Sequence, residues 1–193
     1  MTKVAANKNK MTATNNTIEQ YEKIVSQCKD LYIKKAADYG TSWRVLRPVS
    51  IVDQIYIKAW RIRQIQENDT QLIDDPIENE FVGIVNYGII ALIQYFLPKD
   101  APIELSNDLA QAYYEKQSAD VKTLMLKKNH DYGEAWRAMS QASFVDLILV
   151  KLLRIRQIIA NDGTVKVSEG ADANFADIIN YAIFALIMME ENA

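Results

Sequence analysis

The stretch DYGTSWR at residues 38–44 returns 93 positions later as DYGEAWR at residues 131–137. The likeness continues downstream, where RIRQI at residues 61–65 recurs at residues 154–158 with the same offset. These paired identities indicate a tandem duplication of a unit of about 80 residues, and so long a period is typical of paired domains rather than of a solenoid.

A further shared block completes the unit: IVNY at residues 84–87 matches IINY at residues 178–181, with an offset of 94. Helical spacing of apolar residues, capping signals and Gly or Pro breaks predict three helices in each copy and no sheet core. The helices are expected at about 17–37, 50–68 and 78–96 in the first copy, and at about 107–130, 143–160 and 172–191 in the second.

The predicted fold is therefore all-α, with two tandem three-helix repeats packed as a pseudo-twofold helical bundle. A single repeat is small for a self-sufficient core, so each copy is expected to pack on the other, as in a homodimer of a half-length ancestor. The predicted divisions are a disordered tail at 1–16, the first repeat at 17–97, a linker at 98–106 and the second repeat at 107–193.

Composition narrows the class of protein. Of the 193 residues, 49% are hydrophobic and 24% are charged, which is ordinary for a soluble globular protein. The net charge of −3 argues against a broad nucleic-acid-binding surface. The single cysteine, Cys28, excludes an intrachain disulfide and indicates a reducing compartment. Neither a membrane-spanning run nor a secretory signal is recognised, so a cytoplasmic protein without membrane contact is expected.

A lysine lies inside the apolar face of the second helix in both copies, at Lys58 and Lys151. An unpaired buried charge is costly, so each lysine must either extend its stem to solvent or meet a carboxylate. Its recurrence favours the carboxylate, and we expect each lysine within ion-pair reach of one. Arg61 and Arg154 lie at the edge of the same face.

The third helix of each copy is apolar nearly all round and is expected at the centre of the bundle. In the second copy its polar stripe carries Asp177 and Asn180, one turn apart; the first copy has Gly83 at the position of the acid. Such a pair can offer oxygens to a divalent cation, or Asp177 can neutralise a lysine in a buried network. Because only the second copy keeps the acid, it is expected to dominate any metal or nucleotide binding.

Two further acids, Asp53 and Asp146, each follow a serine by three residues at a predicted helix start. Capping accounts for them, and coordination of a metal is the alternative. The turn that follows the first helix carries lysine, aspartate, tyrosine, glycine and tryptophan in both copies. There a lysine can meet a phosphate and the aromatic rings can stack on a base, or the tryptophan can simply plug the bundle.

The block KKAADYGTSWR at 34–44, with Lys58, RIR at 61–63 and IVNY at 84–87, resembles the nucleotide modification-associated domain 1 family, seen in bacteria and phages. Both copies match, so the resemblance covers nearly all of residues 17–191. It implies a role in the synthesis or handling of modified nucleotides.

A more distant likeness is to the all-α NTP pyrophosphatases, the MazG-like group, which hold magnesium over a triphosphate with acidic pairs one turn apart on facing helices. This chain has no Glu-x-x-Glu pair on its second helix, and only Asp177-x-x-Asn180 resembles half of that pattern.

The expected function is nucleotide binding in modified-nucleotide metabolism, with metal-dependent nucleoside triphosphate pyrophosphohydrolysis as the activity that the distant likeness implies. The alternative is a non-catalytic helical scaffold or binding module, and a homo-oligomer is also open. The expected metal, Mg²⁺, would be held by Asp146, Asp177 and Asn180. The candidate substrate-binding residues are Lys34, Asp38, Tyr39, Trp43, Lys58 and Arg61 in the first copy, and Lys127, Asp131, Tyr132, Trp136, Lys151 and Arg154 in the second.

Overall fold

The computed structural model describes residues 3–68, 70–165, 167 and 169–193, with side chains from residue 16 onward. This described part contains six α-helices, two short 3₁₀ helices and no strand, which confirms the all-α prediction. The helices are α1 (Lys3–Tyr39), η1 (Ser42–Val45), α2 (Pro48–Asn68) and α3 (Ile77–Phe96) in the first copy, and α4 (Asn107–Tyr132), η2 (Ala135–Ala138), α5 (Gln141–Ala160) and α6 (Ala171–Glu191) in the second.

Two predicted boundaries were wrong. The first helix begins at Lys3 rather than near Thr17, because no Gly or Pro interrupts the chain before Gly40. Residues 3–16 of the predicted disordered tail are assigned to α1, and residues 1–2 lie outside the described residues. The interval left between the predicted helices, residues 38–49, contains η1, and α2 starts at Pro48, a position where the missing N–H of proline is not needed.

The predicted serine caps of the second helices were also misplaced. The N-cap of α5 is Ser140, whose Oγ accepts a hydrogen bond from the backbone N–H of Ser143 at 3.2 Å. Since α2 has already begun at Pro48, Ser50 lies inside that helix. Asp53 and Asp146 are therefore not capping residues and need another explanation.

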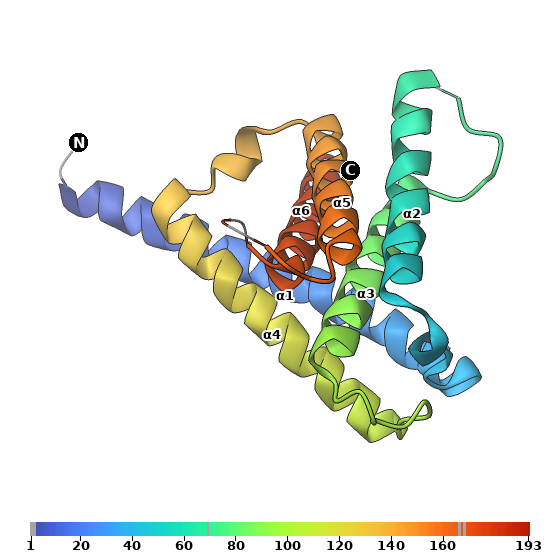
Figure 1. Ribbon diagram of the computed structural model, residues 1–193. Coiled ribbons are helices and arrows are strands. Elements are labelled where there is room, and N and C mark those ends of the chain that lie inside the picture. The colour runs from blue at the N-terminus through green and yellow to red at the C-terminus, as the bar shows by residue number, and fades with distance from the viewer. Residues whose placement is uncertain (1–2, 69, 166, 168) are drawn as a thin grey trace.

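The helices form three layers (Figure 1), with α3 and α6 packed together in the middle. On one side α1 and α4 cross this central pair, and on the other α2 and α5 lie against it and against each other. Most residues of α3 and α6 are buried, as their all-round apolar sequences require. The prediction that the third helices share the centre of the bundle is confirmed.

The two copies are joined across the centre of the bundle by a pair of equivalent hydrogen bonds, as their pseudo-twofold relation predicts. The Tyr21 hydroxyl donates to Oδ1 of Asn180 at 2.8 Å, and the Tyr114 hydroxyl donates to Oδ1 of Asn86 at 2.8 Å. Tyr21 matches Tyr114 and Asn86 matches Asn180 in the repeat, so each copy donates a hydrogen bond to the buried amide oxygen of the other. Burial raises the pKa of both tyrosines, which keeps their hydroxyls protonated as donors.

Helix α6 is long and apolar enough to cross a membrane by length and composition, which the sequence analysis did not anticipate. Within the bundle, 72% of its most apolar window is buried, and it packs between α3 and α5. Its apolar character is therefore that of a core helix.

Candidate functional site

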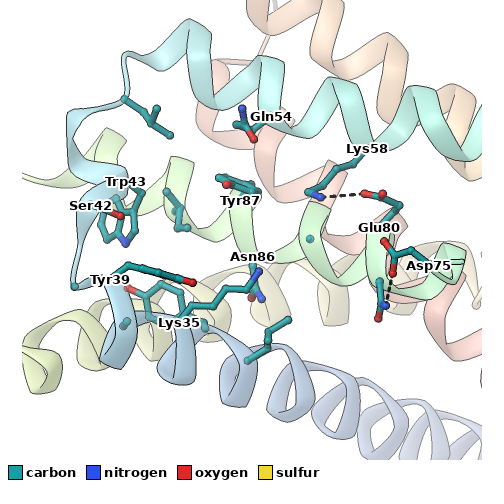
Figure 2. A pocket seen from close by; sticks show the side chains of 18 residues that line it. Lys35, Tyr39, Ser42, Trp43, Gln54, Lys58, Asp75, Glu80, Asn86 and Tyr87 are labelled. Carbon is teal, nitrogen blue, oxygen red and sulfur yellow. Dashed lines mark hydrogen bonds and ion pairs between the residues drawn. The ribbon is translucent and has the colours of Figure 1, made fainter. Parts of the chain in front are cut away.

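A cavity of about 740 Å³ opens within the first copy, between α1, α2 and α3, with η1 at one end. Helices α1 and α2 both flank α3 but pack little on each other, and the cavity occupies the space between them. Its volume falls in the range of small-molecule pockets. Figure 2 shows Lys35 and Tyr39 reaching into it from α1, and Gln54 and Lys58 from α2 opposite.

One end of this cleft is aromatic. Tyr39 and Trp43 lie close together there, and Tyr87 of α3 lies between them and Lys58 in the view of Figure 2. Tyr39 is 69% exposed, so its ring has a free face, while Trp43 is half-buried.

Two buried polar atoms at the aromatic end have no hydrogen-bond partner among the described residues: the hydroxyl of Tyr32 and Nε1 of Trp43. Burial raises the pKa of Tyr32 to about 12, and the Trp43 indole lies near enough to lower it in part, although the two groups form no hydrogen bond of normal geometry. The hydroxyl is therefore neutral and able to donate. Since an unsatisfied buried donor is destabilising, both atoms suit a ligand that supplies acceptors.

The other end of the cleft is charged. Nζ of Lys58 lies 3.0 Å from Oε2 of Glu80, and Nη1 of Arg61 lies 2.9 Å from Oε1 of the same carboxylate. Gly83 makes this arrangement possible, because a Cβ at that position would lie 2.6 Å from Cε of Lys58. The glycine leaves room for the lysine stem to cross α3, and the predicted carboxylate partner of Lys58 is confirmed.

The second copy arranges the same helices differently. Asp177 occupies the position of Gly83, and its two oxygens lie 2.5 Å from Nζ of Lys128 and 2.6 Å from Nζ of Lys151. The predicted partner of Lys151 is thus also confirmed. Burial disfavours the charge on Lys128, but the hydrogen bond and charge of Asp177 outweigh it and raise the pKa of Lys128.

The tryptophan also differs between the copies. Trp136 is 5% exposed and stacks on Phe184, with ring centroids 4.3 Å apart. The first copy has the smaller Ile90 at the position of Phe184, and its Trp43 remains half-buried at the cleft. Trp136 therefore plugs the second copy, whereas Trp43 lines an open space.

The predicted metal ligands do not form a donor set for Mg²⁺. Asp146 is exposed and lies 3.5 Å from Arg63 of α2, about 140° around α5 from Lys151. Asp177 already pairs with two lysines, and Oδ1 of Asn180 accepts from Tyr21. Over the described ranges, three or more His, Cys, Asp or Glu side chains nowhere gather to hold a metal ion.

Asp53 and Asp146 have a structural role instead. Asp53 lies 2.7 Å from Arg156, which matches Arg63 in the repeat, so the two ion pairs join α2 and α5 reciprocally. Both pairs are partly exposed and add little stability each, but they fix the register of the two helices.

The structure brings only some predicted substrate-binding residues together. Tyr39, Trp43 and Lys58 line the cleft, and Arg61 lies behind it, on Glu80. The remaining ones do not line this cleft: Lys34, Asp38, Lys127, Asp131, Tyr132 and Arg154 are exposed, while Trp136 and Lys151 belong to the packed second copy.

Sequence reasoning missed several residues of the cleft, among them Tyr32, Lys35, Gln54, Glu80 and Tyr87. The signal for Lys35 was present, because it recurs as Lys128 and shares a helix face with the partly apolar stripe of α1. Glu80 gave no such signal, since its counterpart in the second copy is an asparagine.

Fold and site together define a duplicated all-α protein whose first copy contains a cleft lined by aromatic and charged residues. The family model described as nucleotide modification associated domain 1 matches residues 35–95 and 128–189, which are most of the two copies and more than half of the chain. The chain therefore belongs to this family. No curated protein and no solved structure is significantly similar to it.

Proposed function

We propose that the cleft of the first copy binds a nucleotide and that the protein acts in modified-nucleotide metabolism by recognising it. The observation that carries the proposal is the gathering of aromatic rings at one end of a single cavity and of lysines at the other. A nucleotide has the same division, with an aromatic base at one end and an anionic phosphate at the other. The family's association with nucleotide modification points the same way.

The aromatic end suits the base. Tyr39 and Trp43 offer faces for stacking, which tolerates any base because each has a π-face. The half-buried amide of Gln54, with no hydrogen-bond partner in the described part of the chain, can both donate to and accept from a base edge. The second copy has Leu147 at that position, which cannot do so.

The charged end suits the phosphate. Lys35 and Lys58 reach the cleft from opposite helices and can donate to anionic oxygens. Glu80 stays neutralised by Arg61 when Lys58 turns toward a ligand, so the rearrangement leaves no buried carboxylate unpaired.

Binding is favoured over hydrolysis because Asp146, Asp177 and Asn180 do not gather into a donor set for Mg²⁺. The proposal places the protein in the cytoplasm, where nucleotides are abundant. The buried Cys28 thiol fits this setting as an inert group, since burial raises its pKa to about 12.

The proposal is tested by titration calorimetry with nucleosides, nucleoside monophosphates and triphosphates, each with and without magnesium. Lys35→Ala is expected to weaken binding of the best phosphorylated ligand about tenfold or more, because it removes a charge-assisted hydrogen bond. Lys34→Ala is the matched control: it removes an adjacent exposed lysine that does not line the cleft. Equal losses in the two variants, or no binding by any member of the panel, would contradict the proposal.

A further inference from the structure

We infer that the first copy contains an anion subsite between Lys35 and Lys58, next to Gly83. In the second copy the carboxylate of Asp177 occupies the equivalent position. The subsite takes a terminal oxyanion, a phosphate or carboxylate group. This inference shares with the proposed function only the cleft in which the ligand binds. The anion subsite could be occupied by a ligand that has no base or sugar.

The internal repeat supplies the comparison. Lys35 matches Lys128 and Lys58 matches Lys151 at an offset of 93, while Gly83 matches Asp177 at an offset of 94. In the second copy the two lysines converge on the two oxygens of one carboxylate, at 2.5 and 2.6 Å. That carboxylate is supplied by the chain itself, and it shows what the two lysines hold when an anion lies between them.

In the first copy no carboxylate lies between the two lysines, and the stem of Lys58 passes over the residue at that position. Gly83 has no side chain, and it lines the cleft together with Lys35 and Lys58. Lys35 makes no hydrogen bond or ion pair within the part of the chain that the structure describes. The second copy thus satisfies its lysine pair internally, whereas the first leaves one of the two lysines for a ligand.

The first copy has not simply lost its acid; the acid has moved by one turn. Glu80 stands where the second copy has Asn174, and from there it holds Lys58 and Arg61 without entering the space over Gly83. Lys58 is therefore held across α3 by Glu80, and its stem, rather than a carboxylate, lies over Gly83. Three cationic side chains, those of Lys35, Lys58 and Arg61, stand against the carboxylates of Glu80 and Asp75, so one positive charge remains in excess for an anion.

A second observation points to a ligand in the same cavity. Tyr32 is 4% exposed and lines the cleft, and its buried hydroxyl has no partner among the described residues. Its counterpart in the self-filled second copy is Met125, which has no donor to satisfy. Nε1 of Trp43 gives no such contrast, because Nε1 of Trp136 is also unpartnered among the described residues, so the Tyr32 hydroxyl is the donor that distinguishes the first copy at these positions.

The experiment exchanges the acids between the copies. Gly83→Asp places a carboxylate between Lys35 and Lys58, where its Cβ meets only the flexible end of Lys58. Gly83→Asn has the same size without the charge and is the matched control. The double variant Asn174→Glu with Asp177→Gly gives the second copy the arrangement of the first. Each variant is titrated with inorganic phosphate, with acetate, and with the nucleoside and nucleoside monophosphate of one base.

We expect Gly83→Asp to weaken phosphate binding about tenfold or more, and to weaken it more than Gly83→Asn does, because an internal carboxylate competes with the ligand. The double variant is expected to gain a second anion site. Phosphate binding above acetate binding identifies a phosphate subsite, and the reverse identifies a carboxylate subsite. Loss of nucleoside monophosphate binding with nucleoside binding retained places the subsite at the charged end of the nucleotide cleft.

Three results would overturn the inference: anion binding unchanged in Gly83→Asp, equal losses in Gly83→Asp and Gly83→Asn, or no binding of either anion by the unmodified protein. Circular dichroism and thermal melting check that each variant is folded, and if the double variant is not, the comparison at Gly83 decides alone. Phosphate binding that Gly83→Asp abolishes, without binding of any nucleotide, would contradict the proposed function and leave the anion subsite standing.

Discussion

Replacing Asp177 with Asn is expected to lower the free energy of unfolding by about 3 kcal/mol or more, because it leaves the charges of Lys128 and Lys151 without a carboxylate. Only 6% of the Asp177 side chain and 11% of the Lys151 side chain are exposed, so water does not replace the lost partner. Denaturant unfolding followed by circular dichroism measures the change.

The reverse deletion supplies the control. Lys151→Met leaves Asp177 paired with Lys128 and places an apolar side chain in the apolar face of α5, so a cost of only about 1 kcal/mol is expected. A loss of similar size in both variants, or a neutral Asp177→Asn, would show that the two lysines do not depend on this carboxylate.

Trp136→Ala is expected to cost about 3–5 kcal/mol in stability, the range for deleting a large buried aromatic side chain. The ring is stacked on Phe184, and the Arg137 guanidinium lies 4.3 Å from its centroid on a cation–π contact. Ligand affinity should change little, because Trp136 does not line the cleft of the first copy.

The equivalent substitution in the first copy, Trp43→Ala, should change ligand affinity more than stability. Trp43→Ala is expected to weaken binding of a nucleotide by about 1–3 kcal/mol through loss of base stacking, with a smaller effect on stability because Trp43 is only half-buried. Thermal melting and calorimetric titration of both variants check the contrast. Identical patterns from the two tryptophans would contradict the division of roles between the copies.

Much of the fold could be predicted from the sequence because the repeat and the apolar periodicity are strong local signals. The central placement of α3 and α6 follows from their all-round apolar faces, and a carboxylate partner for Lys58 and Lys151 follows from the cost of burying an unpaired charge. The start of α1 was missed because residues before Thr17 carry no apolar stripe, although nothing in them breaks a helix.

The site could not be predicted in the same way, because it depends on differences between the copies rather than on their shared motif. The acid of Asp177 suggested an active second copy, yet the contacts show that this acid fills the space between two lysines. The missing acid at Gly83 instead leaves the first copy open. Whether a residue fills a cavity or borders it is decided by packing between helices, which periodicity along one helix does not report.

The two copies of the duplication therefore differ in packing: the second is filled by its own side chains, and the first contains a cleft. The second copy supplies a plugged, internally neutralised partner, and the first keeps a cleft with Lys35 and Tyr32 unsatisfied by the described residues. Reciprocal bonds between Tyr21 and Asn180 and between Tyr114 and Asn86 hold the two copies together, so the open copy does not have to stabilise itself alone.

The most direct measurement is a crystal structure of the protein with the nucleotide that titration shows to bind most tightly. The account predicts density for the base against Tyr39 and Trp43, and for the phosphate between Lys35 and Lys58 over Gly83. Density for the ligand beside Asp177 in the second copy, or in the apolar cavity between the copies lined by Ile51, Ile155 and Phe175, with an empty first-copy cleft, would contradict it.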